Sequence, residues 1–129
     1  MTERLLPYLL VGVGGFLGAN ARFVLARWVG GVSEARFPLG TFLINVSGSF
    51  LLGVLGGVVA LKAGPHGDAL RLALGVGFLG AFTTFSTFEY ETHALLEDGV
   101  WLTATMNVVL SLVAGLVAVR LGLLAARWF

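Results

Sequence analysis

The sequence predicts an all-α membrane protein that crosses the bilayer four times. Of its 129 residues, 57% are hydrophobic and only 12% are charged, whereas an average soluble domain carries about 25% charged residues. The charges are also unevenly spread, because four long windows contain none. A membrane-spanning helix needs about 20 mostly apolar residues, so four such helices with short connections fit a chain of this length.

These windows place the four helices within one domain, residues 1–129. The expected spans are approximately 5–28, 39–61, 70–96 with a break near 80–84, and 100–126. The first span begins with the charge-free stretch 5–21. A cleavable signal peptide is the competing interpretation, but its apolar core is only about 7–15 residues long. Here the apolar sequence continues past Arg22 to Trp28, so we expect a retained helix.

The second and fourth spans are the most uniformly apolar. The second has no charged side chain in 23 residues, and the fourth has only Arg120. Small residues recur at four-residue spacing, as at Gly53 and Gly57. This spacing lets helix backbones approach closely in lipid, so we expect these glycines mainly to pack helices.

The third span is expected to break near 80–84. It contains Gly75, Gly77 and Gly80, and four hydroxyl residues follow within five positions. Glycine weakens a helix, and hydroxyl side chains compete for backbone hydrogen bonds. Backbone groups freed inside a membrane are tolerated only in protein or beside water, and interrupted helices often mark ion sites. A bent, continuous helix is the alternative.

The lysine and arginine residues give only a weak orientation signal. Four spans place both chain ends on one face, which receives five of the eight basic residues. That face carries Arg4, Lys62, Arg71, Arg120 and Arg127, and the other carries Arg22, Arg27 and Arg36. An excess of basic residues normally marks the cytoplasmic side. This small bias fits either two cytoplasmic ends or insertion in both orientations.

Several polar residues lie inside the expected spans, where they are costly unless they face protein or water. The amide of Asn45 needs partners, so it either links helices or faces a pore, and Thr41 lies one turn earlier on the same face. Asn107 and Ser111 form a similar pair in the fourth span. Arg22 either extends its charge to the membrane surface or holds an anion or a carbonyl cluster.

Phe85 and Phe88 share one helix face. Such a pair usually packs in a core or against lipid, but the edge of an aromatic ring is positive and can contact an anion. No Ser/His/Asp set or His/Glu cluster has a spacing suited to catalysis or metal binding, so the sequence predicts no enzyme. A net charge of +1 gives no basic surface for nucleic acid.

Three motifs are informative together. They are Gly80-Ala81-Phe82-Thr83-Thr84-Phe85-Ser86-Thr87-Phe88 followed by Glu91, Gly18 with Arg22, and Pro38-Leu39-Gly40-Thr41 with Asn45. Their combination resembles the small fluoride channels called Fluc or CrcB, and the resemblance covers essentially the whole chain. Two positions depart from the family pattern: Ala81 stands where a second glycine is common, and Asn107 where the family often has tyrosine or histidine.

The resemblance implies a fluoride-selective channel that exports fluoride passively from the cytoplasm through the cell inner (plasma) membrane. It implies an antiparallel dual-topology homodimer with two pores. A structural sodium ion would be held by the backbone carbonyls of Gly80 and Thr83. The pores would be lined by the ring edges of Phe85 and Phe88 and by polar side chains. These side chains are Asn45, Thr41, Ser111, Asn107, Arg22 and Glu91.

Two other functions stay open from the residues alone. One is a membrane scaffold or helix-packing subunit that conducts nothing. The other is a proton-coupled multidrug exporter of similar size, which would need a carboxylate inside its first span, whereas Glu3 precedes that span. Fluoride and chloride efflux from liposomes distinguishes the three.

Overall fold

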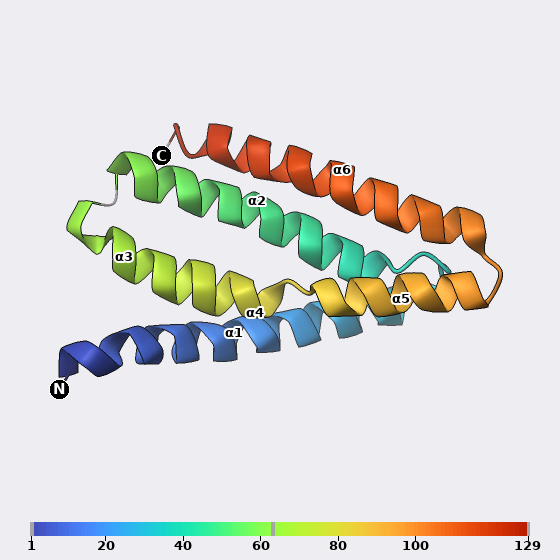
Figure 1. Cartoon of the computed structure of the whole chain (residues 1–129), viewed down its shortest axis with the longest axis horizontal. Helices are drawn as coiled ribbons and strands as arrows, with labels where there is room; N and C mark the ends of the chain where they lie inside the picture. The colour runs from blue at the N-terminus through green and yellow to red at the C-terminus, as the bar shows by residue number, and fades with distance from the viewer. Residues whose placement is uncertain (1, 63, 129) are drawn as a thin grey trace.

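The computed structural model describes residues 2–62 and 64–128, and it confirms an all-helical chain with four candidate membrane helices. Both termini lie at the same end of the bundle, beside the connection between the second and third spans (Figure 1). The spans are Arg4–Val32, Leu39–Leu61, Gly64–Glu97 and Trp101–Ala125, each long and apolar enough to cross a membrane.

The first helix, α1 (Thr2–Val32), runs four residues beyond the expected end at residue 28. No proline interrupts the sequence there, and the next one is Pro38. Helix α2 (Leu39–Lys62) starts directly after this proline. The amide of Phe42 donates to the carbonyl oxygen of Pro38 at 3.1 Å and so closes the first turn.

The third span is built from several short helical pieces. They are η1 (Gly64–His66), α3 (Gly67–Leu70), the π-helix η2 (Arg71–Leu79), α4 (Gly80–Phe82) and α5 (Phe85–Glu97). Between α4 and α5 the chain is extended, so the interruption lies at Thr83 and Thr84. The glycine-rich part therefore winds as a wider helix, and the chain leaves the helix only at the two threonines.

The last helix, α6 (Trp101–Ala125), follows α5 after a tight turn. Gly99 in this turn has a φ of 74°, a left-handed conformation that glycine adopts at little cost. Helix α6 packs along α2, and α1 packs along η2.

Glycines let these helix pairs approach closely. A Cβ at Gly53 of α2 would collide with the backbone oxygen of Val119, and one at Gly122 of α6 would collide with that of Phe50. On α1, a Cβ at Gly18 would meet the backbone oxygen of Phe78 in the same way. Backbone contact of this kind is typical of helix packing in lipid.

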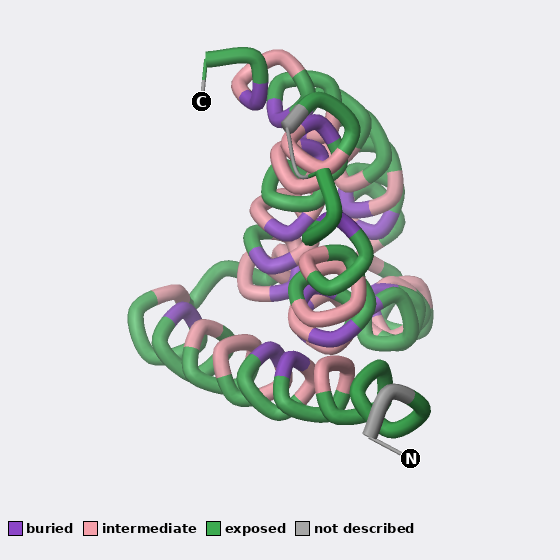
Figure 2. Tube along the Cα trace, turned by 90° about the vertical axis from the view of Figure 1, so that its left-hand side faces the viewer, coloured by how far each residue is buried: buried purple, intermediate pink, exposed green. Residues whose placement is uncertain are grey.

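Exposed residues run along every helix, and the buried ones lie where helices meet (Figure 2). The buried apolar cluster is small and consists of Ile44, Leu79 and Phe82, beside the interruption of the third span. Large apolar side chains such as Phe16, Trp28 and Leu116 stay exposed. A soluble monomer rarely presents so much apolar surface, whereas a bilayer would cover it.

Candidate functional site

The interruption of the third span is stabilised by its own threonines. Thr83 has φ −79° and ψ 158°, and Thr84 has φ −150° and ψ 114°. The Thr83 hydroxyl donates back to the carbonyl oxygen of Leu79 at 2.9 Å. Thr84 Oγ1 accepts the backbone N–H of Thr87 at 3.3 Å and donates to Thr87 Oγ1 at 3.0 Å. Thr84 is thus the N-cap of α5, a position that favours threonine.

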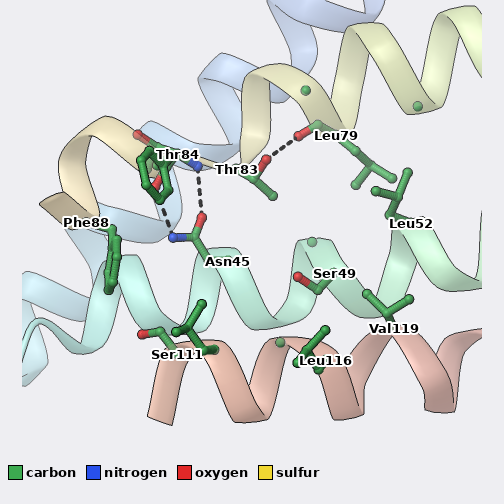
Figure 3. Close-up of a pocket in the computed structure, with 16 residues that line it drawn as sticks. Asn45, Ser49, Leu52, Leu79, Thr83, Thr84, Phe88, Ser111, Leu116 and Val119 are labelled. Carbon is green, nitrogen blue, oxygen red and sulfur yellow. Dashed lines mark hydrogen bonds between the residues drawn. The ribbon is translucent and has the colours of Figure 1, made fainter. Parts of the chain in front are cut away.

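Asn45 holds the interrupted segment from the neighbouring helix α2. Its Nδ2 donates to the carbonyl oxygen of Thr84 at 3.0 Å, and its Oδ1 accepts the Thr84 N–H at 2.8 Å (Figure 3). One side chain therefore satisfies both backbone polar groups of the same buried residue. The amide nitrogen carries two N–H donors, and within the described chain this bond uses one of them.

The interruption leaves several carbonyl oxygens without their helical N–H partners, and those of Gly80 and Thr83 are among them. In a continuous α-helix, the carbonyl of Gly80 would accept the N–H of Thr84, and that of Thr83 would accept the N–H of Thr87. The first N–H goes to Asn45 instead, and the second goes to the hydroxyl of Thr84. Backbone oxygens released in this way are suitable ligands for a hard cation.

A groove of about 440 Å³, called here the central groove, runs between α2, the third span and α6 (Figure 3). Its polar side chains are Asn45, Ser49, Thr83, Thr84 and Ser111, and glycine, leucine, valine and phenylalanine supply the rest of its wall. Within the described chain, none of its lining residues is charged. It is thus a mainly apolar recess with a few hydroxyl and amide groups.

Phe85 and Phe88 both line the central groove, but they differ in exposure. Phe88 is 7% exposed, whereas Phe85 is 72% exposed. Their ring centroids lie 5.9 Å apart, with the planes at 42°. Residues three apart on a helix diverge by about 60°, given 3.6 residues per turn. This difference keeps Phe88 inside the groove and leaves Phe85 at its open side.

A chain of side-chain hydrogen bonds connects α5 to α6. Thr92 Oγ1 donates to the carbonyl oxygen of Phe88 at 2.7 Å, and Asn107 Nδ2 donates to Thr92 Oγ1 at 2.9 Å. Ser111 Oγ donates to Asn107 Oδ1 at 3.4 Å. Ser111 lines the central groove, whereas Asn107 is 1% exposed and lies behind it.

A second recess, called here the end cavity, has a volume of about 210 Å³. It lies where α1 connects to α2, and it brings together Thr41 and Glu91. Within the described residues, Oε2 of Glu91 is a buried side-chain oxygen with no hydrogen-bond partner. A buried polar atom normally has one, so this oxygen is free to meet a small ligand or water.

Comparison with known proteins assigns the family. The family model described as "CrcB-like protein, Camphor Resistance (CrcB)" matches residues 9–123. The chain belongs to the CrcB family. It is therefore a multi-pass membrane protein, as its four apolar helices indicate.

Several curated CrcB relatives are similar over nearly their whole length. "Fluoride-specific ion channel FluC 2" of Moorella thermoacetica is 46% identical over 94% of this chain and 97% of its own. "Fluoride-specific ion channel FluC" of Geobacter sulfurreducens is 45% identical over 92% and 95%. The protein of that name from Chlorobium chlorochromatii is 42% identical over 99% and 98%. These relatives are named as channels, not as enzymes.

The CrcB structure places most of the sequence-predicted residues in the two recesses and two of them elsewhere. The central groove contains Asn45, Phe85, Phe88, Ser111, Gly80 and Thr83. The end cavity contains Thr41 and Glu91. Arg22 lies half-buried on α1 and lines neither recess within the described chain, and Asn107 supports Ser111 from behind.

Ser49 is a groove residue that the sequence analysis missed. It lies one turn after Asn45 on α2, so Thr41, Asn45 and Ser49 form one stripe at four-residue spacing. A Cβ at Gly115 of α6 would lie 3.7 Å from its hydroxyl oxygen. This stripe could have identified Ser49 from the sequence, because polar residues repeated at this spacing share a helix face.

Proposed function

We propose that this CrcB protein is a fluoride-selective channel that exports fluoride passively from the cytoplasm through the cell inner membrane. The observation that carries the proposal is the central groove, where amide and hydroxyl groups meet an apolar wall beside an interrupted helix. Relatives 42–46% identical over nearly the whole chain are named fluoride-specific ion channels. The groove chemistry suits that activity.

Fluoride is small and strongly hydrated, so a purely apolar passage excludes it. Hydroxyl and amide donors replace its waters one at a time, and several moderate sites permit both entry and exit, whereas one strong site would trap the ion. The free N–H of Asn45, the Ser111 hydroxyl and the ring edge of Phe88 are such partners in the central groove. We assign Ser49 to the same wall.

The residues outside the central groove extend the pathway in this proposal. Thr41 and Glu91 form a pair of polar side chains in the end cavity, beside the proposed pathway. Arg22 contributes positive charge near α1 that attracts anions. Asn107 is predicted from the sequence to line the pore, but in this proposal its buried amide acts through Ser111.

We further propose that two copies assemble as an antiparallel homodimer with dual topology and two pores. The central groove is open on one side, and Phe85 projects from it with 72% of its surface exposed. A second copy would cover this groove and the exposed ring. The basic residues are divided five to three between the two faces, and so small a bias permits insertion in either direction.

A structural sodium ion at the dimer centre fits the donors present. The carbonyl oxygens of Gly80 and Thr83 lose their helical N–H partners to Asn45 and Thr84. Carbonyl oxygens suit a hard cation, and two copies supply two such pairs at one axis. When bound, the ion would neutralise these carbonyl dipoles and hold the interrupted helices together.

The dimer and its cation are testable in one experiment. A high-resolution structure of the detergent-purified protein is expected to show two copies in opposite orientations. Density for a cation should lie between the carbonyl oxygens of Gly80 and Thr83. Two parallel copies, or opposed copies with a water-filled centre in high sodium, would contradict the assembly or the ion respectively.

Replacing Phe88 with leucine or methionine is expected to slow fluoride efflux at least tenfold while the protein stays folded. Volume-conserving apolar swaps usually cost less than about 1.5 kcal/mol of stability, but they remove the positive ring edge. Methionine fills similar space with a polarizable sulfur and lacks the ring quadrupole. Efflux from liposomes measures the rate, and gel-filtration elution reports assembly.

Phe82 provides the matched control for this test. It is as buried as Phe88, but it belongs to the apolar cluster with Ile44 and Leu79 and lines neither recess within the described chain. Phe82→Leu is therefore expected to change stability more than efflux. If Phe88→Leu and Phe85→Leu both release fluoride at the wild-type rate, the two rings only pack the structure and do not contact the ion.

A further inference from the structure

We propose that Asn107 is a positioning residue that sets the direction of the Ser111 hydroxyl and thereby weakens fluoride binding in the central groove. The inference rests on the proposed fluoride conduction. It adds a residue that acts on the ion through another side chain. Asn107 itself cannot reach the groove, since it is 1% exposed and lies behind the lining.

The direction of the hydrogen-bond chain follows from the chemistry of its first member. The carbonyl oxygen of Phe88 can only accept, so its 2.7 Å contact with Thr92 Oγ1 requires the Thr92 proton. A hydroxyl has a single proton, and Thr92 Oγ1 must therefore accept from its next partner. That partner, 2.9 Å away, is the amide nitrogen of Asn107.

The orientation of the Asn107 amide then fixes Ser111. With Nδ2 turned to Thr92, Oδ1 faces Ser111 Oγ at 3.4 Å. An amide oxygen only accepts, so Ser111 donates its single proton away from the groove that it lines. In the resting state the groove therefore meets the lone pairs of this hydroxyl and not its proton.

When fluoride binds at Ser111, the serine hydroxyl must turn its hydrogen bond from Asn107 to the ion. The hydroxyl rotates, one hydrogen bond forms to the anion, and the bond to Asn107 Oδ1 is given up. Because one hydrogen bond is lost when another forms, Ser111 binds fluoride more weakly than a serine hydroxyl without a partner would. Because conduction needs sites that the ion can leave, Asn107 favours release.

Two substitutions that free the Ser111 proton test this directly. In Asn107→Leu the acceptor is absent, and the fluoride concentration that half-saturates liposome efflux should fall about threefold to tenfold, the range expected for one hydrogen bond. In Thr92→Val the amide of Asn107 loses the oxygen that orients it and can turn Nδ2 toward Ser111. A smaller fall in the same direction is expected, although Thr92 is not among the described residues that line either recess.

Ser111→Ala separates positioning from packing. In that background Asn107→Leu and Thr92→Val should leave the half-saturating concentration unchanged, because the proton they act on is gone. Thr105→Val, an exposed threonine on α6, is the control and should shift nothing in either background. Gel filtration and thermal unfolding of each variant confirm that folded protein is compared.

The outcomes distinguish this inference from the proposed function. A wild-type protein that passes no fluoride overturns conduction itself. The positioning role is overturned if the wild type conducts but Asn107→Leu does not change the half-saturating fluoride concentration. It is also overturned if Asn107→Leu changes this concentration equally in the wild-type and Ser111→Ala backgrounds. If Asn107→Leu does not fold, Thr92→Val provides the same test. The change that it causes in the half-saturating fluoride concentration must be absent in the Ser111→Ala background.

Discussion

Asn45→Leu is expected to abolish fluoride efflux and to destabilise the fold by about 2–6 kcal/mol, since each buried backbone group left without its partner costs about 1–3 kcal/mol. Leucine has a similar size, but it offers nothing to the N–H and the carbonyl oxygen of Thr84, which Asn45 binds at 2.8 and 3.0 Å. Thr84 is buried, so water does not replace the amide easily. Thermal unfolding in detergent and liposome efflux measure the two effects.

Asn45→Asp tests the same contact with the shape kept. The carboxylate still accepts the Thr84 N–H, but its second oxygen opposes the Thr84 carbonyl oxygen and adds a negative charge beside the proposed anion path. Asn20→Leu is the control, because the amide of Asn20 donates to the Phe16 carbonyl oxygen of its own helix α1. Wild-type stability and efflux in Asn45→Leu would contradict both the clamp and the pore assignment.

Gly53→Ala is expected to cost about 3 kcal/mol of stability, the upper part of the usual range for overpacking. A methyl group at Gly53 would collide with the backbone of Val119 on α6. A backbone oxygen cannot turn aside as a flexible side chain does, so α2 and α6 must separate. Denaturant or thermal unfolding in detergent, together with the yield of folded protein, reports the change.

Gly56→Ala on the same helix is the matched control. Nothing lies within 4 Å of a Cβ there, and alanine is a better helix former than glycine by up to about 1 kcal/mol. This variant should be as stable as the wild type or more stable. Equal stability of the two variants would show that α2 and α6 do not pack through Gly53.

The fold was largely predictable because charge-free windows mark membrane spans directly. The helix ends were less predictable. Nothing between residues 28 and 32 interrupts a helix, so α1 continues to Val32. In the third span the glycines at 75, 77 and 80 were expected to help break the helix, but they lie in η2 and α4. The interruption follows at Thr83 and Thr84, where side chains supply the alternative hydrogen bonds.

Sequence position singled out polar residues of the candidate site, but it did not predict their contacts. Polarity within an apolar span singled out Asn45, but its bond to a backbone 39 residues away depends on helix packing. Asn107 and Ser111 share a helix face, yet one is buried behind the groove and the other lines it. The partner that decides this, Thr92, lies on α5, and no spacing rule connects two different helices.

Fluoride efflux from liposomes containing the purified protein tests the central claim most directly. Vesicles loaded with fluoride or with chloride are diluted into buffer that contains neither of these anions, and valinomycin with potassium balances the charge while pH is equal on both sides. We expect rapid release of fluoride and retention of chloride, with protein-free vesicles retaining both. Retention of fluoride, equal release of chloride, or release only under a proton gradient would contradict a passive fluoride channel.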